Sequence, residues 1–231
     1  MPPSPAVVNY VSTLHATYLR CIKPYVRAQT VALEIGPGRG AWTRTLLAAR
    51  EVWALDALSA EHNQTFEFLG HPQNLRYFQV TDFECAMLPE NYFDYVFSYG
   101  CLCHVSFHGI TEYARHLFPK LKSGANGFWL VADYDKYNHC AAHLDDYSVW
   151  RNLTPPKPKY QPLWWFLRGC ERFMNRPKLK APDVDDTPAP ARWYHAGTQR
   201  TCQMLRETGF QIVDEDVGTC HRDPIIHFVK P

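Results

Sequence analysis

Residues 31–40, VALEIGPGRG, have a spacing that could build a ligand site. An apolar, strand-like run ends near Glu34 and is followed by glycines at alternate positions, Gly36, Gly38 and Gly40. Glycines at a strand-to-helix turn let the backbone bend sharply and let a ligand approach where a side chain would block it. A second strand-like run ends at Asp56, and an acid there can bind both hydroxyls of a ribose. The pattern predicts a site for a nucleoside-containing cofactor.

Two classes of cofactor fit this turn. The segment Gly36-x-Gly38-x-x-Ala41 satisfies the dinucleotide pattern, with Asp56 at the right distance for an NAD-dependent oxidoreductase. The other class is S-adenosyl-L-methionine, whose amino-acid part carries no pyrophosphate. Glu34 favours the second, because a carboxylate attracts the ammonium and sulfonium charges of that ligand and repels phosphates. Glu34 could instead pair with Arg39 or Arg44.

The composition indicates one folded domain without a strong charge. The 231 residues suffice for one α/β domain with a sizeable core, and the formal net charge of +1 argues against nucleic acid as a partner. The first residues do not show a basic region followed by an apolar run, and no apolar run of about 18 residues is present, so we expect no transmembrane segment and a cytoplasmic location. The eight cysteines are then expected as reduced thiols, and Cys101 and Cys103 are too close for a zinc-binding pair.

Strand-like and helix-like runs alternate along most of the chain. An amphipathic helix is expected over 7–28, with Pro24 kinking or ending it. The remaining expected elements are strands at 31–35, 52–55, 75–80, 93–98 and 128–132, helices at 41–49, 59–69 and 109–121, and a turn bracketed by Gly124 and Gly127.

The end of the chain predicts one more helix, over 197–208, and two strands, 210–217 and 225–230. The connection between these strands is too short for a helical crossover, so we expect an antiparallel hairpin. The whole order predicts an α/β fold: a doubly wound, Rossmann-like, seven-stranded mostly parallel sheet with an antiparallel last strand.

Three parts differ in composition. Residues 1–30 are expected as a helix that packs on the core, and 31–135 with 193–231 as the cofactor-binding core. Residues 136–192 hold eight of the 18 prolines and are expected as an insertion that covers the acceptor site as a lid. This insertion also contains the aromatic run Trp164–Phe166 and three arginines, Arg168, Arg172 and Arg176. These side chains could hold an anionic acceptor, or they could anchor the insertion to the core domain. They could also contact a membrane surface or a second copy of the chain in a homodimer.

Taken in order, the motifs resemble those of class I S-adenosylmethionine-dependent methyltransferases, over about 31–135 and 194–230. LEIGPGRG resembles the acidic glycine motif of that family, and the resemblance implies that Glu34 and the three glycines contact the cofactor. ALDA resembles the ribose-binding segment, so Asp56 is expected on the ribose and Ala57 against the adenine.

Later segments extend the resemblance. VTDFECAMLPENYFDYVFSYGCLCHV implies that Asp82 meets the adenine amino group and that Phe83 flanks the ring. Backbone groups of Ser98 and Tyr99 are implied at the methionine end of the cofactor. HLFPKLKSGANGFWLVADY and RETGFQIVDEDV resemble the fifth-strand region and the antiparallel ending of the family.

The positions at which this sequence departs from the motifs of the family limit the class of acceptor. Many relatives have two histidines where this chain has Cys103–His104, and Pro-Gly where it has Ser123–Gly124. FSYG stands in place of the Asn/Asp-Pro-Pro-aromatic motif of base-amino methyltransferases, which argues against DNA or exocyclic amines. We therefore expect methyl transfer to a small-molecule acceptor, at a hydroxyl of a sugar or natural-product intermediate. RNA or protein methylation, a catalytically inactive methyltransferase-like subunit and NAD-dependent oxidation are the alternatives.

Transfer to a hydroxyl requires a group that removes a proton, and histidine has a suitable pKa. The candidates are His104, just after the fourth strand, then His139 and His195. A catalytic metal is not expected, because the fourth strand ends without an acid to complete the oxygen and nitrogen donors of the next loop, which are Asp133, Asp135, Asn138, His139 and His143.

Overall fold

One seven-stranded sheet organises the computed structural model, which describes residues 12–142, 161–174 and 192–231. The strand order is β3-β2-β1-β4-β5-β7-β6, with β1 to β5 parallel and β7 antiparallel to both its neighbours. The predicted fold class is confirmed. The strands are β1 Val31–Ile35, β2 Glu51–Asp56, β3 Leu75–Gln79, β4 Phe93–Ser98, β5 Leu121–Leu130, β6 Gln211–Asp214 and β7 Ile225–Val229.

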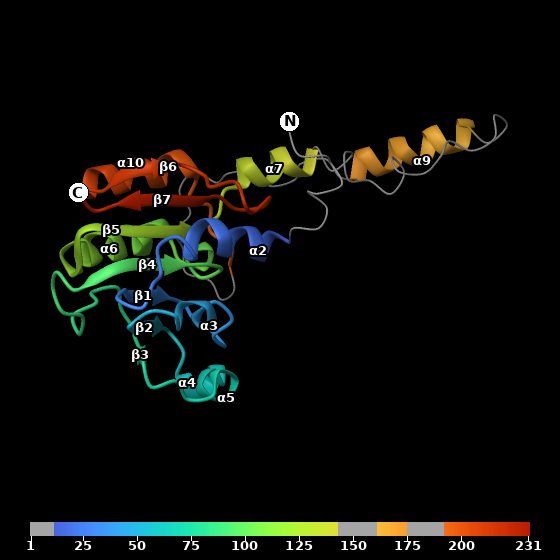
Figure 1. Cartoon of the computed structure of the whole chain (residues 1–231). Coiled ribbons are helices and arrows are strands. Elements are labelled where there is room, and N and C mark those ends of the chain that lie inside the picture. Colours follow the sequence, from blue (N-terminus) through green and yellow to red (C-terminus); the bar gives the residue numbers. More distant parts are fainter. Residues whose placement is uncertain (1–11, 143–160, 175–191) are drawn as a thin grey trace, which may run out of the picture.

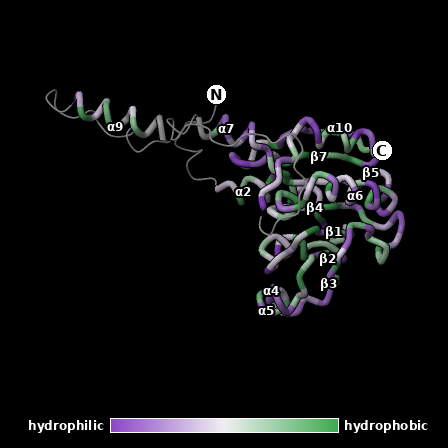
Figure 2. The backbone as a smooth tube through the Cα atoms, turned by 180° about the vertical axis from the view of Figure 1, so that it is seen from behind, coloured by the Kyte–Doolittle hydropathy of each residue, from purple (hydrophilic) through white to green (hydrophobic). Residues whose placement is uncertain are grey.

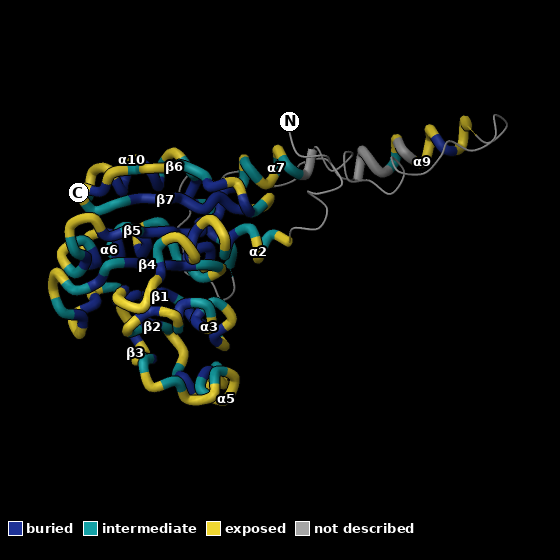
Figure 3. Tube along the Cα trace, viewed as in Figure 1, coloured by how far each residue is buried: buried dark blue, intermediate teal, exposed yellow. Residues whose placement is uncertain are grey.

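Each face of the sheet packs into its own apolar core. In β1, Val31, Leu33 and Ile35 enter one core while Ala32 enters the other, as the two-residue period of a strand requires. Helices α6 (Phe107–Leu117) and α10 (Thr198–Thr208) cover the first face. The π-helix η1 (Tyr18–Ile22) and α3 (Thr43–Leu46) cover the second (Figure 1). The inner strands β1, β2, β4 and β7 are therefore buried along most of their length, whereas the edge strands β3 and β6 are mostly not (Figure 3).

The topology of the sheet indicates where a ligand would bind. The strand order reverses between β1 and β4, and in open α/β sheets ligands bind outside the carboxyl ends of the strands at such a reversal. The predicted glycine turn leaves β1 at this point.

Several predicted helices are shorter than expected. Residues 1–11 lie outside the described residues, and the first described helix, α2 (Thr13–Thr17), runs into η1, which ends before Pro24 as predicted. The helix predicted over 41–49 is only α3, because the turn after the glycines extends to Trp42.

The helix predicted over 59–69 is wrong as a single element. It consists of α4 (Ala60–Asn63) and α5 (Thr65–Leu69), because Gln64 adopts a left-handed φ of 53° between them. Ser59 and Gly70 cap the two ends as predicted, Ser59 through a hydrogen bond from the His62 amide.

The turn predicted at Gly124–Gly127 is also wrong. β5 starts at Leu121 and runs through both glycines, with a register shift opposite β4 between Phe93 and Tyr95. A Cβ at Gly127 would lie 2.2 Å from the Phe228 ring, so this glycine makes room for packing. The preceding helix ends at Leu117, followed by the 3-10 turn η3 (Phe118–Lys120) that contains Pro119.

Within the described residues, two further helices lie between β5 and α10. α7 (Tyr134–Ala142) begins directly after β5, and α9 (Gln161–Met174) extends away from the sheet (Figure 1). Hydrophobic residues colour much of the strands, and α9 carries several as well (Figure 2). Among the described residues, no helix combines the length and the apolar character needed to cross a bilayer.

Candidate active site

The glycine turn after β1 is held close to β2 and to the loop after β4. The Gly36 amide donates a 2.7 Å hydrogen bond to the Leu55 carbonyl. Gly36 has a φ of +72°, and a Cβ there would lie 2.3 Å from the Cys101 Sγ, so only glycine fits. Gly38 differs, because a Cβ there would meet nothing within 4 Å. The turn thus leaves open space beside Gly38.

Asp56 joins the end of β2 to this turn. One carboxylate oxygen accepts a hydrogen bond from the Gly38 amide at 3.0 Å, and the other accepts one from the Leu58 amide at 2.9 Å. Because a carboxylate oxygen has two lone-pair sites, each oxygen can still accept a second hydrogen bond. Asp56 is positioned to bind a diol while fixing the backbone around it.

Glu34 lies behind the glycine turn rather than in open space. Its side chain is 2% exposed and accepts a 2.6 Å hydrogen bond from the Thr43 hydroxyl, so its partner is neither Arg39 nor Arg44. Burial raises the pKa of Glu34 to about 7, against the opposing effect of the Thr43 hydrogen bond, and the nearby Asp56 charge adds to the rise. The carboxyl group therefore changes charge near neutral pH.

A cavity of about 980 Å³ opens at the carboxyl ends of β1 and β2. This volume suits a cofactor together with a small molecule. Four predicted cofactor residues and one predicted base line it: Asp56, Ala57, Asp82, Phe83 and His104. Several other lining residues were not predicted as site residues: Cys101, Val105, Ser106, His108, Tyr113 and Tyr194.

The ring of Phe83 is fixed at the cavity wall. It packs edge-on against Tyr113 with 5.0 Å between ring centroids. A Cβ at Gly109 would lie 2.7 Å from the Phe83 ring, so α6 carries a glycine where Phe83 needs the space. Asp82 is exposed next to it and accepts a hydrogen bond from the Glu84 amide at 2.9 Å. An apolar face and a carboxylate stand side by side.

His104 is tied to a segment far along the chain. Its Nδ1 atom lies 2.8 Å from the carbonyl oxygen of Arg192. A carbonyl can only accept a hydrogen bond, so Nδ1 carries the proton and the neutral ring keeps its lone pair on Nε2. The Tyr194 amide donates to the Cys103 carbonyl at 2.9 Å beside this contact. Residues 192–194 therefore hold His104 in one tautomer at the cavity.

The other two histidines do not line this cavity. His139 lies on α7 and is exposed. The Nδ1 atom of His195 accepts a 3.0 Å hydrogen bond from the Tyr134 amide, which joins the start of α7 to the segment before α10. Ser98 and Tyr99 are not lining residues either: the Ser98 hydroxyl donates to the Ile35 carbonyl, and Tyr99 packs on Trp42. Among the described residues, the structure brings only His104 of the three predicted bases to the cavity.

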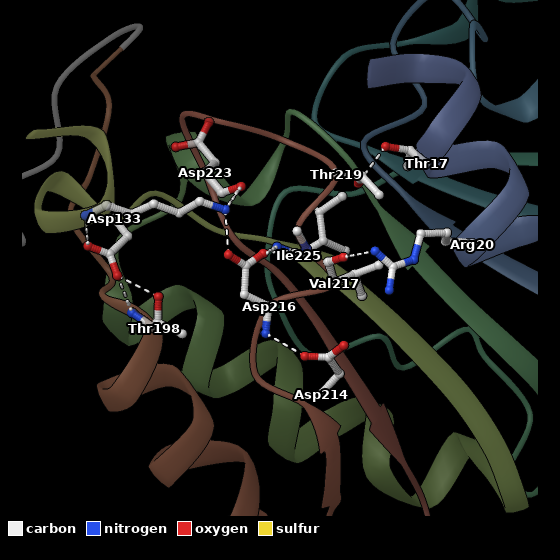
Figure 4. A network of polar contacts seen from close by, with 12 residues as sticks. Thr17, Arg20, Asp133, Thr198, Asp214, Asp216, Val217, Thr219, Asp223 and Ile225 are labelled. Atoms are coloured by element: carbon white, nitrogen blue, oxygen red, sulfur yellow. Dashed lines mark hydrogen bonds and ion pairs between the residues drawn. The ribbon is translucent and has the colours of Figure 1, made fainter. Parts of the chain in front are cut away.

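Both carboxylate oxygens of Asp133, a residue considered above as a metal donor, are occupied by hydrogen bonds within the protein. Its two oxygens accept hydrogen bonds from the amides of Asp135, Lys136 and Thr198 and from the Thr198 hydroxyl. Asp133 thereby links the ends of α7 and α10 in a polar network that Lys136 continues to Asp216 (Figure 4). His143 lies outside the described residues, and the described residues contain no group of three potential metal ligands.

Sequence comparison identifies a methyltransferase domain. A family model described as a methyltransferase domain matches residues 32–124, which span β1 to the first part of β5. Comparison with curated protein sequences finds no match.

Solved structures share the fold at low sequence identity. An S-adenosylmethionine-dependent methyltransferase from Mesorhizobium loti is 17% identical, with a TM-score of 0.59, over 93% of this chain and 97% of the other. A 1,6-didemethyltoxoflavin-N1-methyltransferase from Burkholderia thailandensis, with bound S-adenosylhomocysteine, is 17% identical, with a TM-score of 0.55, over 97% and 80%. The N-methyltransferase NodS from Bradyrhizobium japonicum, also with S-adenosylhomocysteine, is 12% identical, with a TM-score of 0.54, over 95% and 84%.

The matched domain covers the glycine turn and the acid that follows it in sequence, and the complete strand order agrees with the fold of these structures. The chain therefore contains a methyltransferase domain over residues 32–124 and has the fold of these solved methyltransferase structures.

Proposed function

We propose that this methyltransferase transfers a methyl group to a hydroxyl of a small molecule bound in the cavity, a sugar or natural-product intermediate, with His104 as the general base. The observation that carries the proposal is the hydrogen bond from His104 Nδ1 to the Arg192 carbonyl, 2.8 Å long, at a cavity that Asp56 also lines. It leaves Nε2 as a proton acceptor in the neutral ring.

The cofactor of the family, S-adenosyl-L-methionine, is compatible with the residues of this site. Gly38 leaves the turn open, Asp56 has unused acceptor sites for two ribose hydroxyls, and Phe83 offers an apolar face beside the Asp82 carboxylate. We assign these residues, with Ala57, to the adenosine part of the cofactor. Glu34 acts from behind the turn through its charge rather than by lining the cavity. The cofactor supplies a methyl group on a sulfonium sulfur.

The remaining task of the protein is to orient the acceptor and remove its proton. His104 receives that proton on Nε2, while Arg192 keeps the ring from turning. Ser106, Tyr113 and Tyr194 also line the cavity, and polar side chains of this kind suit an acceptor that carries several hydroxyls. These residues and the cavity volume support a small-molecule site.

Two of the solved structures described above are N-methyltransferases, so nitrogen is the competing acceptor atom. An amine with a free lone pair needs no base of the kind that a hydroxyl needs. Retention of activity without His104 would favour nitrogen. The cytoplasmic location, a homodimer and a lid formed by 136–192 stay predictions; no described residue of that insertion lines the cavity.

The experiment is an acceptor screen. Purified protein is incubated with S-adenosylmethionine and a panel of monosaccharides, phenols and primary amines, and S-adenosylhomocysteine is measured by mass spectrometry. The proposal expects product with hydroxyl acceptors. Product with amines alone, or with no member of the panel although the cofactor binds, would contradict it.

A further inference from the structure

The segment that orients His104 is itself held by one tyrosine, Tyr134, the first residue of α7. The Tyr134 hydroxyl donates a hydrogen bond to the Trp193 carbonyl, and the Tyr134 amide donates one to His195 Nδ1 at 3.0 Å. The Tyr134 ring lies against the same two residues, with centroid distances of 4.9 Å to the Trp193 ring and 5.0 Å to the His195 ring. Tyr134 therefore contacts the chain on both sides of Tyr194.

The residues beside these contacts are the ones that meet the active site. Arg192 precedes Trp193 and supplies the carbonyl that lies 2.8 Å from His104 Nδ1. Because peptide groups are planar, only the φ and ψ angles of Trp193 separate the Arg192 carbonyl from the Trp193 carbonyl. The hydrogen bond from Tyr134 to the Trp193 carbonyl therefore restricts the direction in which the Arg192 carbonyl points.

Other contacts hold the indole ring of Trp193 and the chain that follows. The Tyr137 ring packs edge-on against the Trp193 ring, with 5.4 Å between centroids. The Ala196 amide donates a 3.0 Å hydrogen bond to the Ala132 carbonyl, which anchors the chain just before α10. Loss of the Tyr134 hydroxyl would therefore release the Trp193 carbonyl without detaching the segment from the core.

We propose that Tyr134 is a positioning residue for methyl transfer. Its hydroxyl fixes the Trp193 carbonyl and, through it, the Arg192 carbonyl. His104 is thereby kept in the tautomer that presents Nε2 to the acceptor. Tyr134 is not a lining residue of the cavity, so it acts through the segment and does not contact the acceptor. The inference rests on the proposed role of His104 as the general base.

The test measures the tautomer of His104 in the full chain. Long-range proton–nitrogen NMR correlations of protein labelled with ¹⁵N-histidine report which ring nitrogen carries the proton, and the signals lost in His104→Asn identify those of His104. At about pH 8.5, where an ordinary histidine is neutral, the unaltered chain should carry the proton on Nδ1. In Tyr134→Phe, which keeps the ring and removes only the hydroxyl, the ratio of the Nδ1–H form to the Nε2–H form should fall by about fivefold.

Tyr137→Phe is the matched control. It removes a hydroxyl from the same helix, and its ring contacts the same tryptophan. The tautomer ratio of His104 in this variant should equal that of the unaltered chain.

Steady-state kinetics with a hydroxyl acceptor found in the screen give a second readout. Tyr134→Phe should lower kcat by about tenfold with little change in the KM for S-adenosylmethionine, whereas Tyr137→Phe should retain the normal kcat. In a His104→Asn background, Tyr134→Phe should cause no further loss, because the base that the hydroxyl positions is gone.

An unchanged tautomer ratio in Tyr134→Phe would overturn the inference, and so would an equal loss of kcat in both backgrounds. A normal kcat in His104→Asn would instead refute the proposed function. The tautomer ratio would then still decide whether Tyr134 orients the ring of His104.

Discussion

The Nδ1 atom of His104 lies 2.8 Å from the carbonyl oxygen of Arg192, a residue 88 positions further along the chain. The Tyr194 amide, which bonds to the Cys103 carbonyl, fixes the same two segments side by side. The ring that we propose as the base is therefore oriented by the segment that contributes Tyr194 to the cavity. Orientation of a base by a third group is a common requirement of proton-transfer sites.

Replacement of His104 by asparagine should separate catalysis from structure. Asparagine retains a side-chain N–H donor for the Arg192 carbonyl but has no basic nitrogen, so we expect kcat to fall by about 100-fold or more. The KM for S-adenosylmethionine should change little. The measurement is steady-state kinetics with a hydroxyl acceptor identified in the screen. His139→Asn, at an exposed site outside the cavity, is the control and should retain the normal rate. An unchanged kcat in His104→Asn would remove the histidine as base.

Glu34 should make stability depend on pH. Burial raises its pKa from 4.5 to about 7 in the folded state. The folded protein then holds this proton more tightly than the unfolded chain, so stability falls as pH rises between these values, by about 3 kcal/mol. Glu34→Gln keeps an acceptor for the Thr43 hydroxyl and should lack this loss. Urea unfolding at about pH 5 and about pH 8 measures this dependence of stability on pH. The stability of Glu34→Gln relative to the unaltered protein should be greater at the higher pH. An equal difference at both pH values would contradict the assignment.

Gly36→Ala should damage the turn through a specific contact. A Cβ at Gly36 would approach the Cβ of Cys101 to 2.1 Å, in addition to the strain of a φ of +72°. Gly124→Ala is the matched control, because Gly124 has a similar φ of +81° but open space around it. Thermal and urea unfolding should show that Gly36→Ala costs roughly 2 kcal/mol more than the control. Equal costs would mean that the contact with Cys101 relaxes freely.

Asp133→Ala should weaken the junction of α7 and α10. The carboxylate accepts four hydrogen bonds, and although burial works to raise its pKa, those hydrogen bonds outweigh it and lower the pKa. Loss of these bonds should cost roughly 2–4 kcal/mol in the free energy of unfolding. Asp135→Ala, at an exposed neighbouring site, should cost much less. Because the folded pKa is depressed, this difference between the variants should be present at neutral pH and shrink as pH falls through that pKa.

The sequence predicts the sheet well, and it also predicts two residues that the structure places at the cavity. Strands β1, β2 and β4 follow from continuous apolar runs, and Asp56 and Phe83 follow from their positions after strands. The split at Gln64 and the continuation of β5 through Gly127 could not be predicted, because one depends on a local left-handed residue and the other on packing against Phe228.

The acceptor side was harder to predict for a different reason. Tyr194 reaches the cavity through a pairing with Cys103 across a large sequence separation, and no local pattern encodes that pairing. His108 and Tyr113 lie on α6, but only Tyr113 belongs to the buried face of that helix and His108 is exposed, so no single helix face marks both. The tautomer and the orientation of His104 likewise depend on Arg192, which lies 88 positions further along the chain.

Cofactor titration by isothermal calorimetry tests the central claim most directly. The unaltered chain should bind S-adenosylmethionine and not NAD, and Asp56→Ala should lose at least about tenfold in affinity, or 1.4 kcal/mol, while circular dichroism shows that it stays folded. Asp56→Asn, which can still accept one backbone amide, should lie between the two. Uptake of NAD in place of S-adenosylmethionine, or full affinity in the folded Asp56→Ala protein, would contradict the assignment of this turn.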